Sequence, residues 1–315
     1  MRRWFARARA LRDRGVLGMN ERNGAFVLPL NPRQHYPRVD DKLLTKQLAR
    51  RSGIPTPDLL GVVSYYHELD DLPALLNGRD SFVLKPARGA QGNGIVVVTH
   101  SDGETFRKSS GAQLTSTQLR QHVSNTISGV FSLRGDPDSC LIEQRIILHS
   151  AFAAIAHRGI PDIRVVVYRG VPVMAMCRLP TAESDGRANL HQGAIGAGIA
   201  ISTGRATHAA LHNRAVTHHV DTGAPLIDAE IPRWDDVLRL AVHAAEMSGL
   251  GYLGVDVVVD AAYGPLLLEL NARPGLAIQI ANNEGLLPRL RRADALPRAA
   301  LATWSDRLQA ARQLY

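Results

Sequence analysis

Residues 254–276 read GVDVVVDAAYGPLLLELNARPGL. Two apolar runs, 252–260 and 265–271, lie on either side of the turn 261–264. Aliphatic and β-branched runs that flank a short glycine-containing turn predict an antiparallel β-hairpin. Asp256 lies on the first strand, and Glu269 and Asn271 lie two apart on the second, so the last two share one face.

These three side chains present oxygen atoms from paired strands, which is the kind of ligand set that Mg²⁺ takes. Two carboxylates and an amide among apolar neighbours cost several kcal/mol unless something pairs with them. A metal ion is one such partner. A buried salt bridge is the alternative, because Arg273 lies close in the sequence.

A second informative stretch, 84–98, reads LKPARGAQGNGIVVV. It predicts a strand that ends at Lys85, a glycine-rich loop and a second strand at 95–98. Such a loop lets backbone N–H groups approach phosphate oxygens, and Lys85 would add a point charge. The loop is neither a P-loop nor a dinucleotide fingerprint, because it lacks GK[ST] and a strand follows it. A plain tight hairpin is the alternative.

A third group of polar residues lies within and just after a hairpin predicted at 163–168 and 171–178. Asp162 and Arg164 share a strand face, and Arg178, Arg187 and Asn189 come after them. Arginines beside a phosphate site could hold a phosphoryl group or a substrate carboxylate in a bidentate manner. Exposed ion pairs are the alternative for each of them taken singly.

Composition excludes several classes of protein. The 315 residues are 45% hydrophobic and 21% charged, which are ordinary globular values. No run approaches the roughly 18 apolar residues of a membrane span, so no transmembrane segment is expected. Cys140 and Cys177 are too few for a disulfide framework or a zinc site, which favours a reduced, cytoplasmic setting.

The net charge of +8 is concentrated at the two ends of the chain. Residues 1–22 carry seven Arg and two acids, and residues 289–315 carry six Arg and two Asp, so the remaining body is close to neutral. The ends carry few aromatic residues among their arginines, such as Trp4 and Phe5, and the body is near neutral, so nucleic-acid binding is not expected. Only four of the 37 basic residues are lysines, namely Lys42, Lys46, Lys85 and Lys108.

Helical patterns are predicted at 1–14, 40–52, 68–77, 111–128, 233–248 and 295–313, and further strands at 140–147 and 192–204. Residues 59–65 form an apolar stretch. Helices mixed with antiparallel hairpins favour an α+β class over a doubly wound parallel sheet. The basic helix 1–14 would dock on the body of the protein or on a membrane surface or partner. The segment 205–229 carries His208, His212, His218 and His219, which suggests a metal site, an exposed hairpin or an acceptor-site lid.

The order of these motifs resembles the ATP-grasp superfamily, and more narrowly the RimK-type α-L-glutamate ligases and their relatives. The resemblance spans 38–290 and rests on four stretches: LKPARGAQGNGIVVV, PDIRVVVYRGVPV, RANLHQGA and GVDVVVDAAYGPLLLELNARPGL. It implies an ATP-grasp fold, in which two α+β lobes grip ATP, with a truncated N-terminal region. The implied parts are a basic helix and connector (1–37), an N-terminal lobe with a glycine-rich lid (38–142), a C-terminal lobe with the metal site (143–290) and a C-terminal helix (291–315).

The resemblance also implies roles for individual residues. Contacts with ATP would come from Lys42 and Lys85 at the phosphates, from Gly89, Gln91, Gly92 and Gly94 in the lid, and from Glu143, Gln144, Arg145 and Ile146 around the adenine and ribose. Asp256, Glu269 and Asn271 match a site for two Mg²⁺ ions, where Mn²⁺ could substitute. Arg164, Arg178, Arg187 and Asn189 match positions near the γ-phosphate and the acceptor substrates, and the role of His191 is open.

The function implied is an ATP- and Mg²⁺-dependent carboxylate–amine ligase that works through an acylphosphate. It would add an amino acid such as glutamate to a peptide or small acceptor, and a homodimer is compatible with the family. An ATP-binding regulatory protein without turnover, or a phosphotransferase acting on a non-carboxylate acceptor, is the alternative.

Overall fold

The computed structural model describes residues 9–89, 92–132 and 135–315. The chain divides into two compact units. Unit 1 comprises Met1–Asp40, Leu48–Pro55 and Leu148–Tyr315, and unit 2 comprises Asp41–Gln47 and Thr56–Ile147. Each unit has its own antiparallel sheet and its own cluster of buried apolar side chains, so the α+β class is confirmed.

The described part of unit 1 contains a seven-stranded sheet of order β11-β10-β9-β8-β7-β12-β13. Aliphatic runs joined by tight turns produce its hairpins at 162–179 and 252–271, as the sequence predicts. The strands are β7 (Asp162–Tyr168), β8 (Val171–Leu179), β9 (Ile195–Ile199), β10 (Ala206–Leu211), β11 (Arg214–Ala215), β12 (Tyr252–Asp260) and β13 (Gly264–Asn271).

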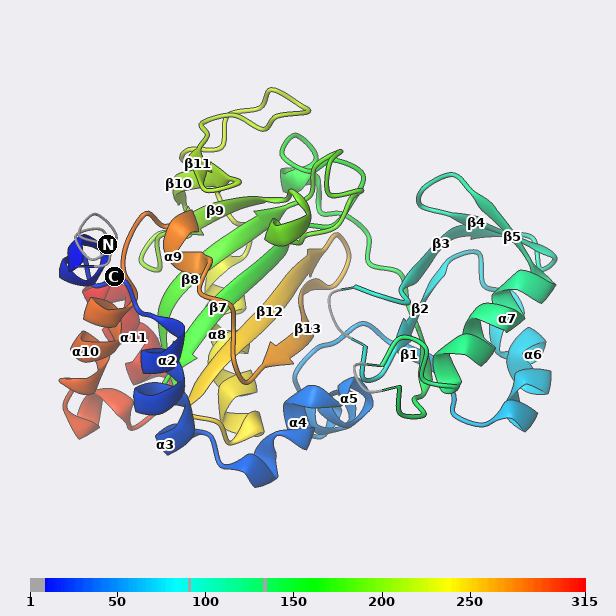
Figure 1. Cartoon of the computed structure of the whole chain (residues 1–315), viewed down its shortest axis with the longest axis horizontal. Helices are drawn as coiled ribbons and strands as arrows, with labels where there is room; N and C mark the ends of the chain where they lie inside the picture. The colour runs from blue at the N-terminus through cyan, green and yellow to red at the C-terminus, as the bar shows by residue number, and fades with distance from the viewer. Residues whose placement is uncertain (1–8, 90–91, 133–134) are drawn as a thin grey trace. The chain divides into compact units, whose positions relative to one another are not determined.

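Helix α8 (Trp234–Ser248) packs against β7, β8, β12 and β13 through a continuous apolar face. Figure 1 shows α8 behind this sheet and the short helix α9 (Ile278–Ala281) in front of it. Gly196 and Gly198 of β9 allow that approach, because a Cβ at Gly198 would lie 2.6 Å from the Ala281 carbonyl oxygen. Helices α10 (Leu287–Asp294) and α11 (Trp304–Leu314) complete the C-terminal end.

The described part of unit 2 contains a six-stranded sheet of order β1-β6-β2-β3-β4-β5. Helix α7 (Ser116–Ile127) packs on β2, β4 and β6, while η3 (Tyr66–Asp71) and α6 (Leu72–Leu76) pack beside β1. Helix α5 (Lys42–Arg51) begins in this unit. The strands are β1 (Leu59–Val63), β2 (Phe82–Pro86), β3 (Val96–Ser101), β4 (Thr105–Lys108), β5 (Gln113–Thr115) and β6 (Cys140–Glu143).

The segment before α5 is tied to the ends of β12 and β13 in unit 1. It contains α2 (Met19–Glu21), η1 (Arg22–Val27), α3 (Leu28–Leu30), η2 (Arg33–His35) and α4 (Pro37–Asp40). The buried Asn31 donates from Nδ2 to the carbonyl oxygens of Tyr252 (2.8 Å) and Ala272 (3.1 Å) and accepts the Tyr252 N–H at 2.9 Å. The buried Arg22 donates to the carbonyl of Pro274 at 2.7 Å. This segment therefore fixes the strand ends next to Asn271.

Several predicted elements have different bounds in the structure. The single helix predicted at 295–313 is wrong: α10 ends at Asp294, Pro297 interrupts, a short 3-10 turn spans Arg298–Leu301 and α11 starts after its cap Thr303. The predicted helix 111–128 begins only at Ser116, because 113–115 pair with β4. The predicted strand 140–147 ends at Glu143. Of the predicted helix 1–14, residues 1–8 lie outside the described part and 9–13 are helical.

None of the helices in the described part of the chain is both long enough and apolar enough to cross a membrane.

Candidate functional site

The register of four neighbouring strands gathers the polar residues of unit 1 on one face of its sheet. Asp162 pairs with Arg178 across β7 and β8, and Arg164 pairs with Asp256 across β7 and β12. Asp256 in turn pairs with Glu269 across β12 and β13. Because directly paired residues share a face and alternate residues return to it, the register places these side chains together.

Asp256 is at the centre of this cluster. Its carboxylate accepts two hydrogen bonds from Arg164, Nε–Oδ1 at 2.7 Å and Nη2–Oδ2 at 2.5 Å. Arg178 Nη2 donates to Asp256 Oδ2 at 2.8 Å and also pairs with Asp162. Only 3% of the Asp256 side chain is exposed. The structure therefore contains a buried network of two carboxylates and two guanidinium groups. It matches the salt-bridge alternative for Asp256 alone, with Arg164 and Arg178 rather than Arg273 as the partners.

The pKa values of the two carboxylates in the cluster shift in opposite directions. Burial raises the pKa of Asp162 to about 6, with the Asp256 charge acting in the same direction and Arg178 opposing it. Burial alone would also raise the pKa of Asp256, but Arg164 and Arg178 outweigh it and hold that pKa below its ordinary value. Burial lowers the pKa of Arg178, but its two carboxylate partners outweigh that effect and raise it.

The predicted metal ligands are only partly engaged in this network. Asn271 Nδ2 lies 3.2 Å from Asp256 Oδ2. The half-buried Glu269 carboxylate has no hydrogen bond or ion pair with any residue that the structure describes. An unpaired carboxylate beside a second carboxylate and an amide oxygen fits a hard divalent cation. Within the described residues, no three His, Cys, Asp or Glu side chains are grouped for a metal, so the amide of Asn271 would have to complete the set.

Arg187, Asn189 and His191 lie on the loop that joins β8 to β9. Arg187 and His191 are exposed, and Asn189 is half-buried with its Oδ1 accepting the His191 N–H at 3.0 Å. The structure thus keeps Arg187 outside the guanidinium–carboxylate network that contains Arg164 and Arg178.

Unit 2 contains a second buried charged group, built from two lysines and one glutamate. Lys85 Nζ lies 2.7 Å from Glu143 Oε2, and Lys46 Nζ lies 3.0 Å from Glu143 Oε1. All three side chains are less than one-tenth exposed. Burial lowers the pKa of Lys46, and Glu143 opposes that shift. Because Glu143 shares its charge between two ammonium groups, the trio carries net positive charge.

Lys46 belongs to this buried charged group but is absent from the site residues that the sequence predicts. It lies four residues after Lys42 in helix α5, which is a signal that both lysines project from one side of that helix. It is also one of only four lysines in a chain that otherwise uses arginine, and that scarcity could have identified it.

Lys42 contacts the glycine-rich loop directly, because its Nζ donates to the Gly89 carbonyl oxygen at 2.6 Å. Gly92 and Gly94 have φ values of 77° and 75°, which favour glycine. The Gly94 carbonyl lies 2.9 Å from His122 Nε2 on α7, so this end of the loop is anchored. Gln91, predicted as a lid residue, lies outside the described part of the chain.

The segment after β6 contains Gln144, Arg145 and Ile146, all half-buried. The Gln144 N–H donates to the Asp58 carbonyl at 2.9 Å. Arg145 Nε is buried without a hydrogen-bond partner among the described residues. These residues continue from Glu143 as irregular backbone rather than as strand.

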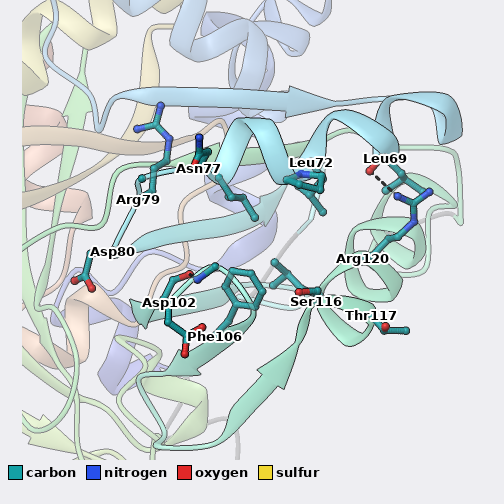
Figure 2. A pocket seen from close by; sticks show the side chains of 16 residues that line it. Leu69, Leu72, Asn77, Arg79, Asp80, Asp102, Phe106, Ser116, Thr117 and Arg120 are labelled. Atoms are coloured by element: carbon teal, nitrogen blue, oxygen red, sulfur yellow. Dashed lines mark hydrogen bonds between the residues drawn. The ribbon is translucent and has the colours of Figure 1, made fainter.

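A separate cavity of about 600 Å³ lies elsewhere in unit 2, and none of the predicted site residues lines it. Figure 2 shows its apolar interior, with Leu72 and Phe106 on opposite sides, and Arg120 directed to the Leu69 carbonyl. Its polar side chains therefore do not converge on a common point.

The four histidines of 205–229 do not form a metal site. His208 Nδ1 lies 3.0 Å from the Ala281 carbonyl, and His218 Nδ1 lies 3.0 Å from the Thr217 hydroxyl. His212 pairs with Glu183, and the buried His219 contacts the Pro180 carbonyl. Each ring has a different partner, which excludes the metal alternative for these described residues.

Comparison with solved structures finds ligases with low sequence identity. An ATP-grasp ligase PsnB complexed with its minimal precursor is 16% identical, with a TM-score of 0.46 and coverage of 88% of this chain and 63% of that one. The D-alanine–D-alanine ligase from Bacillus anthracis complexed with ATP is 18% identical, with a TM-score of 0.43 and coverage of 89% and 67%.

Curated relatives are more similar in sequence. A probable α-L-glutamate ligase of Sodalis glossinidius (strain morsitans) is 28% identical over 261 residues, which are 83% of this chain and 65% of the relative. A ribosomal protein bS6–L-glutamate ligase of Salmonella paratyphi B is 29% identical over 248 residues, covering 79% and 60%. This chain therefore spans about two-thirds or less of the length of these relatives.

The model of one family, described as sugar-transfer associated ATP-grasp, matches residues 21–295. That range includes both sheets, the lysine–glutamate group of unit 2 and the arginine–carboxylate network of unit 1. The resemblance drawn from the four sequence stretches is thereby confirmed at the level of the superfamily, and the chain belongs to the sugar-transfer associated ATP-grasp family.

Proposed function

We propose that this protein is an ATP- and Mg²⁺-dependent ligase that joins a carboxylate to an amine. The observation that carries the proposal is the buried cluster of Arg164, Arg178 and Asp256 beside the unpaired carboxylate of Glu269. Transfer of a phosphoryl group needs cationic donors and a divalent cation to balance the charge on the transferring oxygens. This cluster offers the cationic donors, and carboxylates that could hold such a cation, on one face of one sheet.

In unit 1, Asp256, Glu269 and Asn271 would hold Mg²⁺, which supplies charge neutralisation at the phosphate oxygens. Arg164 and Arg178 already orient Asp256 through its two oxygens. A cation held by Asp256 would compete with Arg164 and Arg178 for that carboxylate, and their planar guanidinium groups would then suit phosphate or acylphosphate oxygens.

In unit 2, Lys85 and Lys42 are proposed to contact the phosphates of ATP. The trio of Lys46, Lys85 and Glu143 supports this role, because the second lysine compensates Glu143 and leaves the charge of Lys85 available. The N–H groups of the loop Gly89–Gly94 would approach the same phosphates. Glu143 to Ile146 are proposed to contact the nucleoside.

The reaction has two balanced steps. A substrate carboxylate oxygen attacks the γ-phosphorus of ATP, the bond to the β-phosphate oxygen breaks, and an acylphosphate and ADP result. The amine then attacks the acyl carbon, phosphate leaves, and the amine loses a proton as the amide forms. Each step develops negative charge on oxygen atoms, so fixed guanidinium and ammonium groups lower its barrier. The steps require no nucleophilic side chain.

The substrate class is proposed from the relatives. Two of them have L-glutamate in their names, and one acts on a ribosomal protein. We therefore propose an amino acid, with glutamate first, and a peptide or small acceptor. The description of the family as associated with sugar transfer adds amino sugars to the acceptors worth testing.

The test is ADP release by the purified chain with MgATP and a panel of L-amino acids, short peptides and amino sugars, followed by mass spectrometry of the products. The expected product has the mass of acid plus amine minus water. A phosphorylated product without an amide would instead indicate a phosphotransferase. ATP binding by calorimetry with no ADP release for any acceptor would contradict the proposal and favour a regulatory protein.

The variant Asp256→Asn is expected to abolish Mg²⁺-dependent turnover. Asp260→Asn on the same strand is the matched control, because Asp260 accepts the N–H groups of Ala262 and Tyr263 and an asparagine oxygen can still do so.

A further inference from the structure

The segment 205–229 follows β9 and contains the β10–β11 hairpin and the turn 217–226. The proposed chemistry does not use it. It nevertheless contacts the loop 180–194, which leaves β8 two residues after Arg178 and carries Arg187, Asn189 and His191. Three side chains of 205–229 make contacts at three neighbouring positions of that loop, at Pro180, Ala182 and Glu183.

His219 makes the innermost of these contacts. Its side chain is completely buried. Nε2 lies 3.0 Å from the Pro180 carbonyl oxygen, and Nδ1 accepts the N–H groups of Asp221 at 3.2 Å and Thr222 at 3.4 Å. A backbone carbonyl only accepts and a backbone N–H only donates, so these contacts use the ring as a donor at Nε2 and as an acceptor at Nδ1. Both ring nitrogens are thus committed to holding the turn 217–226 against the loop.

Asp221 and His212 make the other two contacts. Asp221 Oδ2 accepts the Ala182 N–H at 2.8 Å. His212 Nε2 lies 2.9 Å from both carboxylate oxygens of Glu183. His212 and Asn213 have φ values of 46° and 64°, which are the two left-handed positions of a tight two-residue hairpin turn. That turn directs His212 to Glu183.

The loop 180–194 is closed by its own contacts, so a shift at its first residues, 180–183, would also displace the residues that follow them. The Thr181 hydroxyl donates to the Gly193 carbonyl at 2.7 Å, which closes the loop into a ring. Gly193 has a φ of 96°, and a Cβ there would lie 2.7 Å from Glu183 Cδ. Glu183 is therefore packed against Gly193, where the loop returns to β9 two residues after His191.

We propose that 205–229 is a bracket that holds the loop 180–194 in place, and that His212, His219 and Asp221 are positioning residues for the substrate bound by that loop. The exposed guanidinium of Arg187 fits a carboxylate, and Arg187 lies outside the buried arginine–carboxylate network proposed for the phosphates, so we assign the carboxylate-bearing amino acid rather than ATP as the substrate affected. This inference rests on the proposed function for the identity of the substrate. The bracket itself rests only on contacts within unit 1.

Amide hydrogen exchange of the full chain tests the bracket without any need for turnover. The variants His212→Ala and Asp221→Ala are expected to raise exchange in 181–194 while β12 and β13 keep their protection. His218→Ala is the matched control, because the exposed His218 ring contacts the hydroxyl of the neighbouring Thr217 inside the segment. Unchanged exchange in 181–194 for both test variants would overturn the bracket.

Steady-state kinetics test the role in substrate positioning. For His212→Ala and Asp221→Ala, KM for the amino acid that supports turnover is expected to rise about tenfold or more, because small misplacements of binding groups cost about that much. KM for ATP is expected to stay within about twofold of the unmodified chain, and Asp221→Asn, which retains an acceptor oxygen, should restore most of the effect.

A parallel rise in both KM values, or failure of Asp221→Asn to restore activity, would overturn the positioning role. If the unmodified chain turns over no acceptor, the proposed function fails and the substrate assignment fails with it, while the exchange measurement still decides the bracket.

Discussion

Lys85 is the residue whose replacement most directly tests the proposed phosphate site. Lys85→Met keeps an unbranched apolar stem and removes the ammonium, while Glu143 keeps Lys46 as its partner. We expect kcat for ADP release to fall by roughly 10²–10³, the effect of losing one charge-stabilising donor. Lys108→Met is the control, because Lys108 lies on β4 outside the proposed site. Equal kcat values for the two variants would rule out a phosphate role for Lys85.

Asp162 allows a prediction about pH and stability. Burial raises its pKa from 3.8 to about 6, so the folded protein holds this proton more tightly than the unfolded chain does. The contribution of Asp162 to stability is therefore complete below about pH 4 and is lost as the pH rises through 6. Relative to Asp162→Asn, the unmodified chain should lose on the order of 1–3 kcal/mol of unfolding free energy across that window.

Urea unfolding at several pH values between 4 and 7 measures this difference. Asp102→Asn is the control: hydrogen bonds from Thr105 and Glu104 lower the pKa of the exposed Asp102 to about 2, so its difference from the unmodified chain should stay flat in the same window. A flat difference for Asp162→Asn as well would contradict the prediction.

The grouping of the site residues was predictable only within each hairpin. Alternation along the second strand correctly places Glu269 and Asn271 on one face, and the register confirms Asp256 opposite Glu269. The two bonds between Arg164 and Asp256 depend on β7 pairing with β12, whose residues lie more than 80 positions apart in the chain. No local pattern encodes that pairing, so the salt-bridge network was visible only as an open alternative.

At the scale of elements, hydrophobic alternation and turn residues predicted the long strands of unit 1 well. The strands β4 and β5 were missed because they are short, exposed and polar, and their pairing depends on β3. The helix predicted at 295–313 begins too early, because the apolar spacing of α11 continues back through Pro297. The capping box of Thr303 and Asp306 sets the true start.

Asn31 provides a prediction about the element that precedes α5. Asn31→Ala removes three hydrogen bonds to Tyr252 and Ala272 and leaves the buried Tyr252 N–H and carbonyl without that partner. We expect a loss of about 2–4 kcal/mol in unfolding free energy, because unsatisfied buried polar groups are costly. Denaturant unfolding measures it, with Asn77→Ala at an exposed position as the control. A loss below about 0.5 kcal/mol would show that the segment does not stabilise the strand ends.

For the whole molecule, the two separate clusters of buried apolar residues argue for two units that can open independently. Leu119 belongs to the cluster of unit 2 and Leu238 to that of unit 1, and each is at most 1% exposed. Leu→Ala at either site removes well-packed atoms and should cost about 2–5 kcal/mol. We propose that these units correspond to the two lobes that the sequence predicts, and that sub-global opening therefore follows the unit boundary.

Native-state hydrogen exchange of the full chain measures whether the two units open separately. Leu119→Ala should raise exchange in β2 and β6 and leave β7 and β12 protected, whereas Leu238→Ala should do the reverse. Because α5 contributes residues to both units, its amides should respond to both variants. Equal acceleration of all four strands by either variant would mean that the chain opens as one cooperative body. In that case a substrate bound to one unit would stabilise the other just as strongly.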